Sequence, residues 1–531
     1  MRALFVVVAL AVAGSLYAPP ASLAQAPPPC AGDCTASRVV HTADLIMMVN
    51  IALESADAAQ CPNGIPAGKP MTIALIVEAV SNALHGCPTG NATFTPPPTS
   101  TATATIAPPT PTPTETPIPP TPHHFCDLPG SVLTTVPGIA VVPGGPADAP
   151  DLSFLHLPVG FCAHFFAQVG NARQLRFAPG GELFVASPTC TTTGGGPGGQ
   201  SAIIVLPDDN HDGVADAAIT FLGGPCNPGE PLCGNNQRSS GCLPATQGLL
   251  FTGGYFYYQD GTKIRRVPYK THDRSPSGPN EQVANIGVYT SPLHWPKALD
   301  ADDDGTIYVG NGGDEGEACD LRHPFHGGIL KLDGSPGGAQ VAKGFRNPIS
   351  LRCARGHNMC FAIELTRDYS TAQGGREKLL PIRDGDDWGF PCCATRNIPF
   401  PDIRPVPDCS MVAAEIDSFI VGHTPFDLDF ETGKWPEPWK NHVFVPLHGA
   451  YGTWEGASVI AIDFDAMTGE VLPGSNLGGM FSGAMSEFAS GWAKAPRTHG
   501  RPANVAFAPD GRLFLGNDNT GDIIWIAPVD L

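Results

Sequence analysis

The sequence predicts an all-β fold, a six-bladed β-propeller that follows a small disulfide-stapled α-helical module. Two observations point to the propeller. The segment FAPDGRLFLGNDNTG, which begins at Phe507, recurs in related form as FAPGGELFVAS from Phe177 and DADDDGTIYVGNGG from Asp300. The 531 residues also include 62 Gly and 57 Pro, whereas only 15% are charged, and this composition favours short strands joined by tight turns.

The first 26 residues, MRALFVVVALAVAGSLYAPPASLAQA, have the layout of a secretory signal peptide. The basic residue Arg2 precedes an apolar run, and small residues follow it, so cleavage is expected after Ala24 or Ala26. The run is too short for a retained transmembrane helix, and we expect no other membrane span. The mature protein is therefore expected to be secreted or periplasmic.

Sixteen cysteines in an exported chain indicate disulfide bonds. The first four, Cys30, Cys34, Cys61 and Cys87, form a set that can pair within itself, although the spacing does not define the pairs. The net charge of −20 argues against a nucleic acid or an anionic membrane as partner.

Residues 27–90 contain two apolar stretches of helical character, TADLIMMVNIALES and MTIALIVEAVSNALHG, each preceded by a polar loop. The arrangement resembles the paired calcium-binding units of dockerins and EF-hands. In the first loop Asp33, Thr35, Ser37 and Asp44 occupy positions 1, 3, 5 and 12, but Arg38 replaces the usual glycine at position 6. Because hard cations need several carboxylates, we expect a degenerate module that acts as a spacer or binds another protein. Residues 91–125, rich in Pro and Thr, are expected to form an extended linker.

Residues 126–531 are predicted to form the propeller. Three further hairpin patterns accompany the repeated segments, beginning at Gln247, Asn347 and Pro425. Six such units indicate a radial array of sheets, in which every blade buries both faces against its neighbours. A two-sheet sandwich, the alternative, needs far fewer strands. The six blade openings are placed at Ala172, Leu243, Ser291, Lys343, His423 and His499.

Basic residues stand close to the predicted innermost strands of three blades. His294, Arg346 and Arg501 each lie within a few residues of the strand start. Since the inner loops of a propeller converge on its central channel, these side chains predict a cationic, proton-active pocket for a small polyanionic ligand.

Several motifs carry a family resemblance, among them HWPKALDADDDGTIYVG, GFRNPISL, RDGDDWGFP and GRPANVAFAPDGRLFLGNDNTGDIIWI. In order and spacing, from Ala172 to Pro528, they resemble the soluble quinoprotein sugar dehydrogenases of the glucose/sorbosone dehydrogenase class. The resemblance implies pyrroloquinoline quinone (PQQ) and Ca²⁺ as cofactors and a small sugar, an aldose or a sorbosone-like carbonyl sugar, as substrate. It leaves the electron acceptor unknown.

The same resemblance assigns roles to individual residues. His294 matches the general base, and Arg346 and Asn347 match the pair that contacts the reacting quinone oxygen. The remaining candidates are Arg501, His448 and Lys297 as cofactor-binding residues, and Thr366 and Arg367 as backbone-carbonyl ligands of the calcium ion.

The sequence departs from the family pattern at two positions that bear on function. Gln247 stands where the sorbosone branch usually has a histidine, and Arg367 would lie beside the ion. Two other functions therefore stay open: a non-catalytic propeller that binds carbohydrate or a protein, and a metal-dependent lactonase-like propeller. The lactonase would need carboxylates around an axial metal, whereas the blade openings offer mostly basic groups.

One acidic segment lies outside this scheme. In PDDNHDGVAD the residues Asp208, Asn210 and Asp212 have the spacing of a calcium loop, with Asp216 nearby. A solvated turn rich in Asp and Asn is the favoured interpretation, and a structural calcium site is the alternative.

Overall fold

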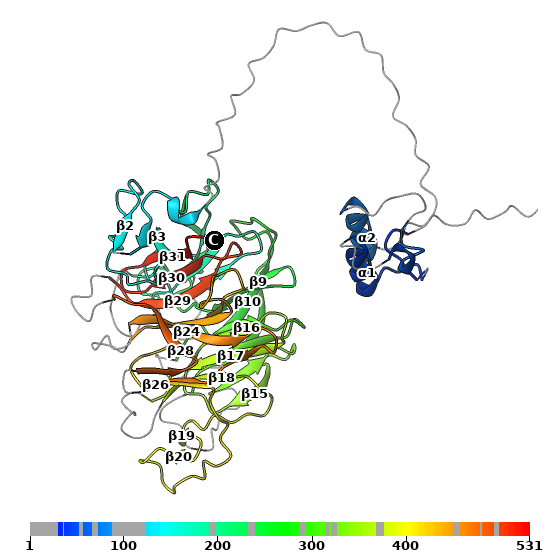
Figure 1. Cartoon of the computed structure of the whole chain (residues 1–531). Coiled ribbons are helices and arrows are strands. Elements are labelled where there is room, and N and C mark those ends of the chain that lie inside the picture. The colour runs from blue at the N-terminus through cyan, green and yellow to red at the C-terminus, as the bar shows by residue number, and fades with distance from the viewer. Residues whose placement is uncertain are drawn as a thin grey trace, which may run out of the picture. The chain divides into compact units, whose positions relative to one another are not determined.

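The computed structural model describes residues 30–35, 37–52, 57–65, 73–85, 87, 124–136, 138–190, 198–231, 239–286, 294–313, 319, 327–367, 376–449, 457–477, 480–492 and 499–531. The expected signal peptide and nearly all of the expected linker lie outside these ranges. The chain divides into two compact units, Met1–Thr114 and Glu115–Leu531 (Figure 1). None of the described helices is both long and apolar enough to cross a membrane.

The N-terminal unit is a helix pair closed by two disulfides. Helices α1 (Thr42–Ala52) and α2 (Ile73–His85) flank the 3₁₀ turn η1 (Ala58–Gln60). The disulfides are Cys30–Cys87 and Cys34–Cys61, so the four cysteines do pair among themselves. Two bridges and one small apolar core stabilise a unit too short to bury much surface. This core comprises Ala31, Cys34, Met48, Ile51, Cys61, Leu75 and Ala79.

Two carboxylates of the expected calcium loop accept hydrogen bonds from backbone N–H groups of this unit. Asp33 accepts hydrogen bonds from the backbone N–H groups of Ser37 (3.0 Å) and Arg38 (2.6 Å). Asp44 accepts from the N–H of His41 at 2.8 Å, which satisfies a donor at the start of α1. Asp44 thus caps a helix.

The second unit is a six-bladed propeller, as predicted (Figure 1). Three blades are simple four-stranded antiparallel sheets. Their strands, from the channel outward, are β4 (Gln174–Phe177), β5 (Leu183–Ser187), β6 (Ala202–Leu206) and β7 (Ile219–Gly223); β8 (Leu249–Thr252), β9 (Tyr255–Asp260), β10 (Lys263–Pro268) and β11 (Glu281–Asn285); β12 (Leu299–Ala301), β13 (Ile307–Asn311), β14 (Gly328–Lys331) and β15 (Ala339–Lys343).

Blades four and five carry additions at their outer edges. Blade four consists of β16 (Pro348–Ala354), β17 (Met359–Glu364), β18 (Glu377–Pro381) and β21 (Asp417–Phe419), extended by β26 (Gly474–Leu477) and β27 (Met480–Gly483). Blade five consists of β22 (Asp429–Phe430), β23 (His442–Leu447) and β24 (Ser458–Asp465), with β25 (Glu470–Val471) and β28 (Met485–Ala489) paired to β24. A separate hairpin joins β19 (Cys393–Thr395) to β20 (Ile398–Pro399).

The sixth blade closes the ring. Its inner strands β29 (Pro502–Phe507), β30 (Leu513–Asn517) and β31 (Asp522–Pro528) end the chain, and β3 (Phe161–Gln168) pairs antiparallel with β31. Figure 1 shows red β31 beside cyan β3. In the sheet, β1 (Val132–Thr134) pairs with the outer side of β3, and β2 (Ile139–Val141) forms the edge beyond β1. In the chain, the short turn η2 (Phe125–Asp127) comes before β1. The disulfide Cys126–Cys162 ties η2 to β3. Further disulfides in the described part are Cys226–Cys242, Cys319–Cys392, Cys353–Cys360 and Cys393–Cys409.

Apolar cores fill the spaces between neighbouring blades. Phe184 of blade one packs with Phe256 of blade two, and Phe444 of blade five packs in one cluster with Val505 of blade six. Burial on both faces explains why the strands read as nearly continuous apolar runs.

Two arginines cross the channel inside the ring. Arg176 of β4 donates to the carbonyl oxygens of Leu249 (3.0 Å) and Leu299 (2.9 Å), in blades two and three. Arg352 of β16 donates to those of Leu175 and Val505, both at 3.4 Å, and pairs with Asp427 at 3.2 Å. These contacts join the innermost strands of blades one, two, three, four and six and the segment that leads into β22, the innermost strand of blade five.

Candidate active site

The mouth of the channel is the end at which the innermost strands begin. Because neighbouring strands are antiparallel, residues that follow the second strand of a blade lie at this same end. His294, Arg346 and Arg501 precede β12, β16 and β29, whereas His448 and Asp518 follow β23 and β30. The fold therefore gathers at the mouth most of the residues that the sequence singled out.

His294 and Arg346 are linked through Gly313. Nδ1 of His294 lies 2.5 Å from the carbonyl oxygen of Gly313, and the N–H of Gly313 donates to the carbonyl oxygen of Arg346 at 2.7 Å. A carbonyl oxygen only accepts, so Nδ1 carries the proton of the neutral ring and Nε2 is the proton-accepting nitrogen. The loop is tight, since a Cβ on Gly312 would lie 2.7 Å from Cβ of His294.

Glu364 fixes the segment that carries Arg346 and Asn347. Its Oε1 accepts the N–H of Arg346 at 2.7 Å, and its Oε2 accepts the N–H of Asn347 at 3.1 Å. Burial raises the pKa of Glu364 to about 7, although the neighbouring Lys378 and the two N–H groups act in the opposite direction. Glu364 is thus a positioning residue behind two candidate site residues.

Two side-chain oxygens near these loops have no hydrogen-bond partner within the described ranges. They are Oδ1 of Asn347 and Oε1 of Gln247, and both residues are buried. Gln247 donates through Nε2 to the carbonyl oxygen of Ile349 at 2.9 Å. Buried acceptors usually have a partner, so these atoms point to a hydrogen-bonding ligand.

Lys297 is fully buried behind His294. Its Nζ lies 3.4 Å from the carbonyl oxygen of His294, and its backbone N–H donates to Gln259 at 3.0 Å. Burial lowers the pKa of Lys297 to about 7. Lys297 therefore contributes only part of a positive charge near neutral pH.

Arg501 and His448 meet around Asp518. Nε2 of His448 lies 2.7 Å from Oδ2 of Asp518, which also accepts from Arg173 at 3.0 Å. Nε of Arg501 lies 3.6 Å from Oδ1 of the same carboxylate. The ring of Phe426 stacks on that of His448, with the ring centroids 4.5 Å apart. The guanidinium of Arg173 lies over the Phe426 ring in a cation–π contact. Blades one, five and six thus share one buried charged cluster.

The cluster has a net positive character. Burial lowers the pKa of His448 to about 4, and the attraction of Asp518 only partly opposes this. Burial alone would raise the pKa of Asp518, but His448, Arg501 and Arg173 lower it below its ordinary range. Nδ1 of His448 also lies 3.0 Å from the carbonyl oxygen of Gly449, so both ring nitrogens face acceptors. In either protonation state of His448, one carboxylate faces two guanidinium groups.

Thr366 and Arg367 lie in the loop after β17, one residue beyond the end of the strand, and the next residues along this loop, 368–375, lie outside the described ranges. Thr366 is buried. Arg367 makes a bidentate pair with Asp402, with both N···O distances 2.9 Å, and lies over the ring of Phe400. The charge of Arg367 is therefore compensated by Asp402.

Sequence reasoning missed three members of the site: Glu364, Asp518 and Arg173. Arg173 stands inside the first blade opening, ARQLRF, and Asp518 inside the repeated segment LGNDNTG. Both could have been found by searching the residues after each second strand as well as those before each first strand.

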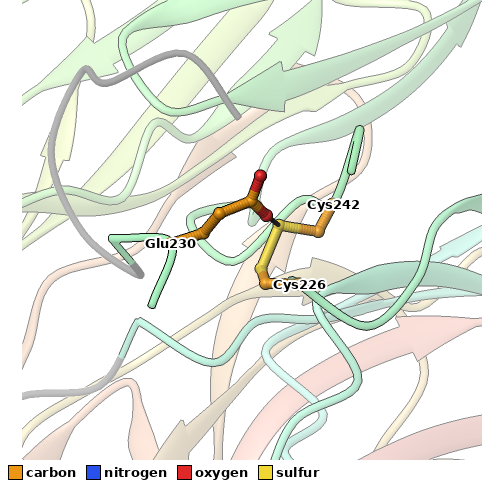
Figure 2. Close-up of side chains that lie close together, drawn as sticks. All are labelled: Cys226, Glu230 and Cys242. Carbon is orange, nitrogen blue, oxygen red and sulfur yellow. Dashed lines mark hydrogen bonds between the residues drawn. A yellow bond between two sulfur atoms is a disulfide. The ribbon is translucent and has the colours of Figure 1, made fainter. Parts of the chain in front are cut away.

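A different cluster of metal-ligating residue types lies elsewhere. Cys226, Glu230 and Cys242 are the one group of three described His, Cys, Asp or Glu residues whose ligand atoms lie within 4.8 Å of one another. Figure 2 shows that the two cysteines form a disulfide, with an S–S distance of 2.04 Å. Glu230 instead accepts hydrogen bonds from Ser239 and Ser240. Since no thiolate is present, this cluster is a stapled loop and not a metal site.

No family model and no curated protein sequence matches the chain. Solved structures do match. A Trichoderma reesei protein of Carbohydrate-Active Enzymes family AA12 is 15% identical with a TM-score of 0.55, over 70% of this chain and 97% of the other. The PQQ domain of pyranose dehydrogenase from Coprinopsis cinerea, in its holo form, is 14% identical with a TM-score of 0.55, over 72% and 98%. The region from Glu115 onward thus has the propeller fold that the family resemblance implied, shared with the PQQ domain of a sugar dehydrogenase.

Proposed function

We propose that the chain is a PQQ-dependent oxidoreductase that oxidises a small sugar at the mouth of the propeller. One observation carries the proposal: His294, in the tautomer whose Nε2 accepts a proton, is tied through Gly313 to Arg346. A proton acceptor and a fixed cation, held on the neighbouring blades three and four by contacts to the same glycine, suit the removal of a proton and a hydride from an alcohol. The shared fold supports this function.

The residues at the mouth fit a polyanionic quinone. Arg501 and Arg173 outnumber the single carboxylate of Asp518, so the cluster retains positive charge for the carboxylates of the cofactor. Oδ1 of Asn347 is buried and lacks a partner in the described part of the chain, which suits a hydrogen-bonding group of a ligand. Arg501, Arg346 and Asn347 would hold the cofactor. His448 and Lys297 would support the site from behind, since both ring nitrogens of His448 face chain oxygens and Lys297 is fully buried. When bound, the quinone supplies the acceptor for a hydride.

His294 would act as general base. Its Nε2 takes the proton of the sugar hydroxyl, and the Gly313 carbonyl stabilises the resulting imidazolium through Nδ1–H. The same hydrogen bond keeps the ring in one orientation before the substrate arrives.

Arg346 would stabilise negative charge that develops on the ligand. Its backbone is fixed on both sides, by Glu364 through N–H and by Gly313 through C=O, so little reorganisation is needed.

A calcium ion beside the quinone would be held by backbone carbonyl oxygens near Thr366 and Arg367. Because Asp402 neutralises the guanidinium of Arg367, that side chain adds little repulsion toward an ion. A lactonase-like metal centre is less favoured, since Asp518 and Glu364 are both occupied by chain donors.

The chain is proposed to work outside the cytoplasm, and its disulfides support this. The N-terminal unit, residues 27–90, is proposed to be a spacer or a docking module for another protein.

The test uses purified protein, added PQQ and CaCl₂, and a panel of sugars with an artificial dye as electron acceptor. The proposal expects quinone-dependent dye reduction with at least one aldose or sorbosone-like sugar. Failure of the protein to bind PQQ at micromolar concentration would refute it and would favour the non-catalytic binding propeller.

A further inference from the structure

The hairpin loop between β6 and β7 carries a cation-binding pattern that the proposed function does not use. Asp208, Asn210, Asp212 and Asp216 occupy positions 1, 3, 5 and 9 of this loop. Gly213, at position 6, has a φ of 83°, the conformation that calcium loops need for their sharp turn.

Asp208 gives independent evidence for a ligand. Its side chain is 10% exposed, and both carboxylate oxygens are buried without a hydrogen-bond partner among the described residues. The nearest cation, Nη1 of Arg512, lies 4.0 Å from Oδ2, beyond hydrogen-bond distance. Arg512 is engaged by Asp510 at 3.0 and 2.8 Å and stacks over Phe125. A buried, unsatisfied carboxylate is costly, and a bound cation would remove that cost.

The surroundings of Asp208 carry an excess of negative charge. Burial raises the pKa of Asp208; Arg512 lowers it, and Asp212 and Asp216 raise it further. A cavity of about 340 Å³ adjoins the loop; its lining includes four carboxylates, of Asp208, Asp209, Glu182 and Asp510, and three basic groups, of Arg512, His211 and His272. Carboxylate and amide oxygens in such numbers are the ligands that Ca²⁺ prefers.

The loop is hydrogen-bonded to β3 and β31, the strand pair that closes the ring. The N–H of Ala215 donates to the carbonyl oxygen of Phe166 in β3, and Nε1 of Trp525 in β31 donates to that of Gly213, both at 2.9 Å. The cavity also touches Gly180 and Gly181, in the turn that follows β4. This turn is at the opposite end of the blade from the mouth, so the loop is distinct from the candidate active site.

We propose that the Asp208–Asp216 loop binds a calcium ion that stabilises the closure of the propeller ring. Asp208, Asn210, Asp212 and Asp216 supply the side-chain oxygens. Asp212 and Asp216 already accept the N–H groups of Val214 (2.9 Å) and Asp209 (2.6 Å), but a carboxylate has further lone pairs. The carboxylate oxygens of Asp208, Asp212 and Asp216 do not all lie within 4.8 Å of one another, so the proposal requires the exposed side chains of Asp212 and Asp216 to turn toward Asp208 when the ion binds.

The experiment compares full-length protein, treated with a chelator and kept free of quinone, with and without CaCl₂. Thermal unfolding and calorimetric titration are measured for the wild type, Asp208→Asn and Asp212→Asn. Asp333→Asn is the matched control. The Asp333 carboxylate also accepts a backbone N–H group of its own turn, that of Ser335, but no acidic cluster surrounds it among the described residues. Asp212 is exposed, so its variant tests the site even if Asp208→Asn fails to fold.

We expect calcium at about 100 times its Kd to raise the midpoint of wild-type unfolding by roughly 3 °C. Each loop variant should lose one bound ion and most of this shift, whereas Asp333→Asn should match the wild type. Equal stoichiometry and equal shifts in the wild type and Asp212→Asn would overturn the proposal, as would a wild type whose midpoint does not respond to calcium. Because no quinone is present, neither result depends on the proposed catalytic function.

Discussion

The carbonyl oxygen of Gly313 lies 2.5 Å from Nδ1 of His294, while the N–H of the same residue donates to the carbonyl oxygen of Arg346. One residue therefore sets both the tautomer of the candidate base and the position of the candidate electrostatic catalyst. A displacement of this loop would therefore disturb two candidate functional groups together.

Replacement of His294 by alanine should remove most turnover and leave the fold intact. Loss of a general base typically costs about 10²–10⁴-fold in rate. The measurement is kcat with PQQ and CaCl₂ present, together with quinone affinity, which should change little. The control is His272→Ala, because the His272 side chain is exposed and pairs with Glu182 at the other end of blade one. Near-wild-type kcat in His294→Ala would contradict the base assignment.

Replacement of Arg501 by glutamine should weaken quinone binding. The lost charge-assisted hydrogen bond is worth about 1.5–3 kcal/mol, or roughly 10- to 150-fold in Kd. Fluorescence or calorimetric titration of the quinone-free protein gives Kd. Arg266→Gln, which breaks an exposed pair with Glu281 on an outer strand, is the matched control. If both variants bind quinone equally well, Arg501 does not contact the cofactor.

Replacement of Glu364 by glutamine should loosen the Arg346–Asn347 segment. Both oxygens of Glu364 accept backbone N–H groups, but an amide has only one accepting oxygen, so one N–H would lose its partner. We expect the free energy of unfolding to fall by about 1–3 kcal/mol, with weaker quinone binding. Chemical denaturation and quinone titration measure the two effects. Unchanged values in both would show that Glu364 does not position this segment.

The stability of the protein should depend on pH through His448. Its pKa is depressed to about 4 in the folded state, against 6.5 as its ordinary value. The unfolded chain then binds the proton first as the pH falls, so this contribution to stability is present above pH 6.5 and is lost toward pH 4. The slope is at most about 1.4 kcal/mol per pH unit. Denaturation of the wild type and His448→Gln between these limits should give curves that converge at low pH; parallel curves would contradict the assignment.

Removal of everything before Phe125 should leave catalysis unchanged. The shortened chain keeps β3, which completes the sixth blade, and the Cys126–Cys162 disulfide. Activity per folded molecule, with folding checked by circular dichroism, is the measurement. A folded but inactive fragment would show that the N-terminal unit takes part in the reaction.

The blade pattern could be predicted because it is local in the sequence. All six predicted openings lie just before an innermost strand, from Gln174 in blade one to Pro502 in blade six. The outer strand of the last blade could not be found in this way, because β3 and β31 are separated by nearly the whole propeller. The strands β26 and β27 likewise return to blade four after most of blade five has been completed.

The site was harder to predict than the fold for the same reason. Arg173 and Asp518 are 345 residues apart, and only ring closure brings them within 3.0 Å. Glu364 acts on two backbone N–H groups rather than on a side chain, and no sequence motif reports such a contact. His294, Arg346 and Arg501 could be found because they stand shortly before innermost strands, whereas Glu364 ends β17 and Asp518 follows β30.

The two arginines that cross the channel, Arg176 and Arg352, have a kinetic consequence for the proposed enzyme. Their side chains join innermost strands from opposite sides of the ring, so they lie across the channel between its two ends. Under the proposed function we expect sugar and electron acceptor to use the mouth in turn, so that the oxidised product leaves before the acceptor approaches. Turnover of this kind is ping-pong, with parallel double-reciprocal plots when both reactants are varied.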